Sequence, residues 1–515
     1  MASCLWLERP GRWRGATVGV LLLVLAFPSA PLLARGLTSG GGGLGPFAAA
    51  LAHSMVIAVW TIGISLVVGL PGGVATALYE YRGRSLLLPL ALLPALIPPF
   101  LLSIGWSYLV PRMRGTGACV LVFSSALAPL VLLASYAAAR SLPRSLVDAA
   151  RLAGGEGALL HSALRHAAPA AMLVAGFAGV LTLSDPGPGQ VFGVRTAASE
   201  LLVSFAAQYD LELAARQCLV LSAVVLLASA PLAWLAAPRL SAALSARAPS
   251  DAAPHRAVGW MWASAAPLAT MVVAGVIAPL AGLVEPLASS LWTPLADQPH
   301  PELVALWAFG EVLRTVASTF VYAAGAAAVS VALALLWTLA VGRDRRLLAL
   351  STAALLPLLA LPSATAALGL TRLVALAPGW ADDVVRGRFA VCLALGLRLA
   401  PLAALLVLRG YGATARSLTL AAALHGVPLP RYLVRVLLPL LRSAVLLAAL
   451  LVALLASGDV TTVLLLQPPG QPSLPLAIFT VMANAPEHLV AALCLAYVGL
   501  ASAALIGLWS LASRT

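Results

Sequence analysis

The chain has 515 residues, of which 61% are hydrophobic and only 10% are charged, and its mean hydropathy is +0.99. A soluble domain carries about 25% charged residues. No soluble fold of this length could bury so much apolar surface, so the composition excludes a soluble protein and indicates membrane lipid as the surrounding medium. The net charge of +13 would suggest a nucleic-acid partner in a soluble protein, but membrane topology accounts for it here and no nucleic-acid partner is expected.

All 31 basic residues are arginines, because the sequence contains no lysine. A Walker A phosphate loop requires Gly-Lys-Ser/Thr to hold the nucleotide phosphates. The chain is therefore expected not to be an enzyme and not to hydrolyse ATP by itself. Its five cysteines are scattered, without the spacing of a metal site, and we expect no metal and no bound cofactor.

Apolar runs in chain order predict an all-α membrane protein with about twelve transmembrane helices. A span needs about 20 apolar residues to cross the hydrocarbon layer. The first run follows three arginines, as in a signal peptide, but lacks a convincing cleavage site before the glycines at 40–43 and is predicted to be an uncleaved helix. The predicted spans are 15–35, 52–78, 86–110, 118–138, 168–186, 214–236, 260–284, 314–342, 347–370, 389–408, 441–466 and 489–512.

The arginines predict the orientation of these spans. With the N-terminus inside, the inner segments carry 21 arginines and the outer segments carry nine, while Arg398 falls within a span. Cytoplasmic loops are enriched in Arg and Lys. This bias predicts a multi-pass membrane protein with both termini in the cytoplasm, and we expect the membrane to be a bacterial inner membrane.

The sequence contains an internal repeat with a constant offset of 272 residues. Leu127-Ala-Pro-Leu recurs from Leu399, and Arg144-Ser-Leu recurs from Arg416. Six spans in each half give two parallel six-helix repeats. We therefore predict an N-terminal helix and outer segment at 1–51, a first repeat domain at 52–240, a linker with an extra helix and outer loop at 241–313, and a second repeat domain at 314–512.

The long inner loop after the fourth span of each half is the most informative segment. The first copy reads Arg144-Ser-Leu-Val-Asp148-Ala149-Ala150-Arg-Leu-Ala-Gly154, and the second reads Arg416-Ser-Leu-Thr-Leu420-Ala421-Ala422-Ala-Leu-His-Gly426. Small residues allow another protein to approach closely, and a glycine lets the chain bend between two short helices. Pro439 is placed to open the next membrane helix. The simpler alternative is an ordinary basic loop, but two copies at one offset favour a docking element.

These loops resemble the Glu-Ala-Ala, three residues, Gly, nine residues, Ile-x-Leu-Pro pattern of the membrane subunits of ATP-binding-cassette importers with the type I fold. The resemblance covers nearly the whole chain, and its duplicated, fused form looks like the iron(III) permeases. It implies partnership with two copies of an ABC ATPase subunit and with a periplasmic substrate-binding protein. It also implies that the loops are coupling helices, with contacts through Asp148, Ala149, Ala150, Gly154, Leu420, Ala421, Ala422, Gly426 and Pro439.

The two copies depart from this pattern in different ways. Asp148 replaces Glu and keeps the charge, whereas Leu420 removes it. His166-Ala167 stands where Leu-Pro is expected, so the first copy is predicted to end differently. The solute is expected to be ferric iron, with thiamine, phosphonate or a polyamine as alternatives.

Three charged residues fall in or beside predicted spans. Asp185 and Asp459 lie near the outer ends of the fifth spans of the two halves, and Arg398 lies within a span. Intramembrane charges are costly and often mark a transport path. The alternative is structural, in which each carboxylate caps a broken helix or pairs with an arginine.

Two other functions are consistent with a polytopic chain. A secondary transporter would also show a parallel repeat, but it should carry ion-coupling carboxylates deep in several helices, and such groups are few here. A membrane-embedded enzyme would need a catalytic constellation, and none is visible within the spans.

Overall fold

The computed structural model describes residues 12–32, 44–245, 255, 258–292, 301–375, 378–379 and 386–512. The glycines at 40–43 and residues 246–254, 256–257 and 293–300 of the predicted linker lie outside these ranges. Within them the chain is all-α apart from one isolated backbone bridge. The helices up to the linker are α1 (Arg12–Ala26), η2 (Phe27–Ser29), α3 (Gly45–Leu78), α4 (Arg84–Leu92), η3 (Leu93–Leu96), α5 (Pro99–Leu109), α6 (Thr116–Arg140), α7 (Arg144–Thr182), α8 (Gly187–Val191), α9 (Ala197–Ala206) and α10 (Leu211–Ser245).

The remaining helices follow residue 257, and the first four of them lie within the predicted linker segment at 241–313. They are η4 (Val258–Trp260), α11 (Trp262–Val272), η5 (Val273–Ile277), α12 (Ala278–Trp292), α13 (Pro301–Val341), α14 (Arg345–Ala360), α15 (Ser363–Ala375), α17 (Arg388–Ala413), α18 (Arg416–Leu424), α19 (Leu429–Tyr432), η8 (Leu433–Leu437), α20 (Leu438–Ser457), α21 (Val460–Leu466), α22 (Leu474–Val481) and α23 (Glu487–Ala512).

The helices have the length and composition of a multi-pass membrane protein. Over the described residues, ten are long and apolar enough to cross a bilayer, and up to twelve cross if each of two bent pairs forms one span. Every predicted apolar run overlaps one of these helices or pairs. The class of fold, a helical membrane protein, is therefore confirmed.

Two predicted spans are sharply bent. The run 86–110 bends by 104° between η3 and α5, and the run 347–370 bends by 77° between α14 and α15. Each break contains a proline, Pro98 and Pro362, which disfavours a helical conformation in the residue before it. Both prolines take part in contacts or pockets between helices, so the breaks fall inside the protein. Both predicted spans are therefore present as pairs of helices joined at a bend.

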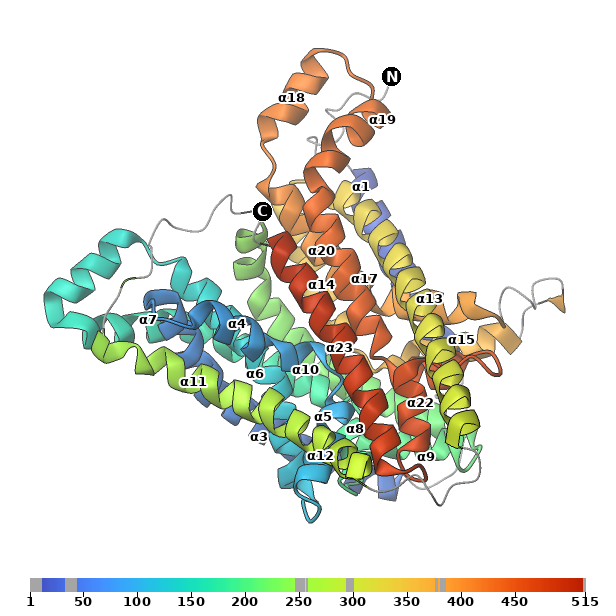
Figure 1. Cartoon of the computed structure of the whole chain (residues 1–515). Helices are drawn as coiled ribbons and strands as arrows, with labels where there is room; N and C mark the ends of the chain where they lie inside the picture. The colour runs from blue at the N-terminus through green and yellow to red at the C-terminus, as the bar shows by residue number, and fades with distance from the viewer. Residues whose placement is uncertain are drawn as a thin grey trace.

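The helices form two bundles with matching internal contacts (Figure 1). In the first, α3 packs against α6 and α7, and in the second, α13 packs against α17 and α20. Small residues at these contacts let the helix backbones approach closely. Such close packing is expected in a membrane, because the hydrophobic effect does not bring helices together in lipid. Gly73 of α3 lies against the Leu132 carbonyl of α6, and Gly396 of α17 lies against Val329 of α13.

The outermost helix of each bundle comes from the other half of the chain. α11 and α12 lie across α3, α4 and α5 of the first half, whereas α1 and η2 pack on α13, α14 and α15 of the second (Figure 1). Both contacts are made at glycine: Gly105 of α5 meets Gly282 of α12, and Gly369 of α15 meets the Pro28 carbonyl of η2. Gly369 lies 264 positions after Gly105, the same interval that separates the two break prolines.

We expect Gly369→Ala to displace α1 and η2 from the second bundle. A Cβ at this position would overlap the Pro28 carbonyl oxygen, and overpacking of this kind costs about 1–3 kcal/mol. Thermal unfolding in detergent should show a lower melting temperature. Gly499→Ala is the matched control, because a Cβ there meets nothing within 4 Å. Equal melting of the two variants would mean that this contact does not hold the helices together.

Candidate functional site

Two loops project beyond the bundles from corresponding positions in the two halves. The N-terminal part of α7 leaves the first bundle, and α18 and α19 leave the second (Figure 1). α7 continues to Thr182 and α19 leads through η8 into α20, so each projecting element continues into a membrane helix. The loops are therefore mechanically joined to the bundles that carry them.

A glycine bend divides each projecting loop, but not at the same aligned position. In α7 both Gly154 (φ −167°, ψ 25°) and Gly155 (φ 65°, ψ −158°) leave the helical conformation. Only Gly155 is left-handed, where glycine has no steric penalty. In the second copy, Gly426 itself has φ +65°. The predicted bend is present in both loops, with Gly155 rather than Gly154 as its left-handed residue.

The most exposed large hydrophobic side chains of the loops are two leucines. Leu152 is 91% exposed and Leu424 is 87% exposed, and they are separated by the repeat offset of 272. A second pair at the same offset, Leu146 and Leu418, is also exposed. Single exposed leucines are common, but matched pairs on two projecting tips give each tip an apolar surface suited to an apolar groove.

The residues predicted for these loops lie around the tips. Ala150 and Ala422 are half-buried at the base of their helices, whereas the remaining predicted residues of both loops are exposed. The exposed set is Asp148, Ala149, Gly154, Leu420, Ala421, Gly426 and Pro439. Apart from Pro439, which lies in α20, the predicted site residues of each loop thus share one projecting element.

The two loops also end differently, as their sequences predicted. Pro439 lies in the first turn of α20, where a missing N–H leaves no intrahelical bond unmade. His166 and Ala167 lie in the uninterrupted interior of α7. A π-helical turn, η8, precedes α20 in the second copy only. The first loop therefore enters its membrane helix without such a turn, whereas the second enters through a π-helical turn and a proline in the first turn of α20.

The three predicted charged residues come together where the bundles meet. Arg398 Nη1 forms an ion pair with Asp459 Oδ2, and Asp185 lies within electrostatic reach of Arg398. Asp459 Oδ1 also accepts a bond of 2.8 Å from the Thr462 N–H and caps α21. Asp185 Oδ1 accepts a 2.8 Å bond from the Gly187 N–H. Capping and pairing, the structural alternative, are therefore both present.

The same region contains the breaks of both bent spans. Pro98, at the first break, packs on Gly458 beside Asp459, and Phe100 meets Phe479 edge-on with ring centroids 6.0 Å apart. At the second break, the Ala360 carbonyl accepts a 3.3 Å bond from the Ser184 hydroxyl beside Asp185. The break in each half therefore packs beside the aspartate of the other half: Pro98 lies beside Asp459, and the Ala360 carbonyl lies beside Asp185. These contacts fill the place where the two bundles meet.

No group of three or more His, Cys, Asp and Glu side chains arranged to hold a metal ion occurs among the described residues. Comparison of the chain with protein-family models, with curated proteins and with solved structures finds no match. Inference about function therefore depends on the loops, the charged cluster and the chemistry of the sequence.

The sequence interpretation missed the two leucine tips. Their signal was present, because Leu152 and Leu424 are separated by the repeat offset and stand in polar loops, where a repeated leucine has no core to fill. It also missed Glu156 and His255, whose contact depends on a part of the chain about 100 residues away from α7.

Proposed function

We propose that this chain is the membrane-spanning permease subunit of an ATP-binding-cassette importer with the type I fold. The observation that carries the proposal is the pair of projecting helix–glycine–helix loops at one sequence offset, each tipped by an exposed leucine. The absence of lysine, and with it of a Walker A loop, assigns ATP hydrolysis to a separate subunit. No cofactor is assigned to this chain.

In this proposal two ATPase subunits bind on the cytoplasmic side, one at each loop. Leu152 and Leu424 would insert into apolar grooves, where burying a leucine side chain contributes about 1.5–3 kcal/mol. Closure of the ATPase pair would then draw the loops together. Since each loop is continuous with a membrane helix, movement of the loops would make the two bundles rock about their shared contact. The path would then open alternately to the two sides of the membrane.

The duplicated contacts support the proposal of two parallel repeats. α3 with α6 and α7 matches α13 with α17 and α20, and each half receives an outer helix from the other. In this proposal, the outer helix that each half receives from the other keeps the two halves joined, while the contacts between the two bundles can change. The domains proposed are those expected from the sequence, at 52–240 and 314–512, with α1 serving the second.

The proposed translocation path runs between the bundles at the charged cluster. Asp185, Arg398 and Asp459 supply charged groups to this path, Phe100 of the first broken span lies beside Gly187, and Phe100 meets Phe479 of α22 edge-on. A path closed by side chains of both halves would open when the halves rock apart. The observed contacts correspond to its closed form.

The proposed location is a bacterial inner membrane, with both termini in the cytoplasm and a periplasmic binding protein delivering the solute. Ferric iron is proposed from the family resemblance alone, with thiamine, phosphonate or a polyamine as alternatives. Hard cations prefer oxygen ligands, and the path offers two carboxylates, which suits transient passage of such an ion.

The energy source tests the proposed function. A strain lacking the chain should lose uptake of radiolabelled iron(III), and uptake restored by the chain should stop on ATP depletion but persist when the proton gradient is dissipated. Uptake that survives ATP depletion and follows the proton gradient would favour a secondary transporter. Normal iron uptake in the deletion strain would exclude iron as the solute and leave the other solutes to be assayed in the same way.

A further inference from the structure

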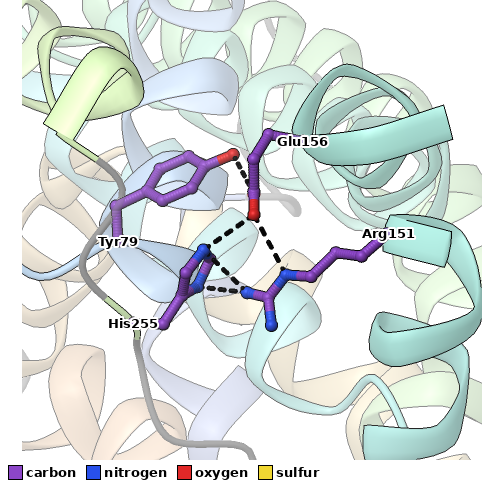
Figure 2. A network of polar contacts seen from close by, with 4 residues as sticks. All are labelled: Tyr79, Arg151, Glu156 and His255. Atoms are coloured by element: carbon purple, nitrogen blue, oxygen red, sulfur yellow. Dashed lines mark hydrogen bonds and ion pairs between the residues drawn. The ribbon is translucent and has the colours of Figure 1, made fainter.

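A four-residue polar cluster joins the first projecting loop to the segment between the two halves (Figure 2). Arg151 and Glu156 belong to α7, Tyr79 follows the end of α3, and His255 lies in the connection between the halves. The Glu156 carboxylate accepts bonds from the Tyr79 hydroxyl at 3.2 Å and from His255 Nε2 at 3.0 Å. Its Oε1 lies 3.2 Å from Arg151 Nε. One carboxylate therefore gathers three partners from three segments.

His255 is held in place by its backbone as well as by its ring. Its N–H donates to the Leu78 carbonyl at 3.0 Å, and its carbonyl accepts from the Glu80 N–H at 3.0 Å. These two bonds form the isolated parallel bridge with Tyr79. The rings of Tyr79 and His255 lie 5.3 Å apart at their centroids. The residue is thus fixed to the end of α3 independently of its contacts with α7.

Both ring nitrogens of His255 face α7. A ring with its proton on Nε2 donates to Glu156, while Nδ1 accepts from the Arg151 guanidinium. Burial, and then the Glu156 carboxylate, raises the pKa of the Tyr79 hydroxyl, which keeps it protonated as a donor. The side chains of Arg151, Glu156 and His255 are between 24% and 28% exposed, so the cluster is largely shielded from water.

The cluster spans the glycine bend. Arg151 precedes Gly154-Gly155 and Glu156 follows it, so the ion pair closes across the two residues that leave the helical conformation. Paired glycines lack side-chain restraint and lose much conformational freedom when ordered. Contacts to His255 and Tyr79 from outside the loop supply the restraint that the bend itself lacks.

The second loop has no counterpart to this cluster. The residues 272 positions after Arg151 and Glu156 are Ala423 and Pro428, neither of which carries a charge. Its bend uses a single left-handed glycine, Gly426, followed by Pro428, which restricts the backbone locally. One loop is thus restrained by distant segments and the other by its own sequence.

We infer that His255 is a positioning residue, which ties the bend of the first loop to α3 and makes the two docking loops mechanically unequal. The first loop would transmit movement both into α7 and, through His255, into the start of the second half. The second loop would transmit it into α20 and, at its start, through Thr414 to Arg343, but no residue from outside the loop is bonded across its bend in the described part of the chain. The coupling part of this inference rests on the proposed function, whereas the restraint of the bend does not.

Hydrogen exchange on the purified full chain in detergent tests the restraint directly. His255→Ala should make the amides of residues 153–157 exchange about tenfold faster, because the bend opens locally once its outside contacts are lost. His255→Gln, which can both donate to Glu156 and accept from Arg151, should restore slow exchange. His161→Ala, an exposed histidine on the same helix, is the control and should leave these amides unchanged. Unchanged exchange in His255→Ala would overturn the inference.

A second measurement separates positioning from general stability. In the transport assay, His255→Ala should lower the ratio of solute moved to ATP hydrolysed, while His255→Gln keeps the wild-type ratio. Exchange in α6 and α17 should stay at the wild-type rate, which shows that the fold is intact. Faster exchange throughout the chain would overturn positioning in favour of a structural role. If the wild-type chain shows no ATP-driven transport, the proposed function fails, and the exchange result still decides the restraint.

Discussion

Replacing the two exposed loop leucines with aspartate, L152D together with L424D, should reduce ATP-dependent uptake by at least about 100-fold. Each leucine that enters an apolar groove contributes about 1.5–3 kcal/mol, and every 1.4 kcal/mol is about tenfold in binding. A carboxylate would in addition be desolvated without a partner. Each single substitution should cost about tenfold. Uptake and subunit binding should be measured in the same membranes.

The matched control keeps the apolar character of the tips. L152M with L424M should retain most uptake, because methionine is flexible and close to leucine in volume. Since both positions are about nine-tenths exposed, neither pair should change the stability of the isolated chain by more than about 0.5 kcal/mol. Wild-type uptake by the aspartate pair would show that the leucine tips are not docking surfaces.

Removing the buried ion pair should give the largest loss of stability. Asp459→Asn leaves the Arg398 guanidinium without its bonded carboxylate but preserves the cap of α21, because the asparagine Oδ1 still accepts from Thr462. Breaking a buried pair costs about 3–5 kcal/mol. The Asp459 side chain is 3% exposed and that of Arg398 is 26% exposed, so we expect a loss near the lower end of that range. Thermal unfolding in detergent measures it.

Two further variants show whether the pair itself causes the loss. Adding Arg398→Met to Asp459→Asn removes the uncompensated charge and should recover most of the stability, as replacement of a buried pair by apolar groups often does. Asp185→Asn should have a smaller effect, because Arg398 keeps Asp459 and the asparagine can still accept from the Gly187 N–H. Melting of Asp459→Asn at the wild-type temperature would contradict the pairing.

Much of the architecture could be predicted from the sequence, because the signals for membrane spans are local. Within the described residues, apolar length located every helix or bent pair that is long and apolar enough to cross a bilayer, and loop composition located the projecting loops. The bends at Pro98 and Pro362 were missed, since proline within an apolar run is also tolerated in membrane helices. The exchange of α1 and α11–α12 between halves could not be predicted, because hydropathy does not say which helices pack together.

The candidate site was predicted in composition but not in its connections. Asp185, Arg398 and Asp459 were each identified, yet only the folded chain brings together Arg398 and a carboxylate 61 residues away. Adjacent glycines left the position of the first bend open, and Gly155 rather than Gly154 takes the left-handed conformation. The contact of His255 with Glu156 depends on the path of the connecting segment, which no local pattern encodes.

The central claim is that this chain works only with separate ATPase subunits bound at its two loops. The most direct test is to purify the tagged chain from its native membrane in mild detergent and measure the mass and ATPase activity of the complex. We predict two copies of a Walker A-containing subunit for each chain, with ATPase activity, and loss of both copies in the L152D/L424D variant. A wild-type chain that purifies alone without ATPase activity, or a complex unchanged by the two substitutions, would contradict the claim.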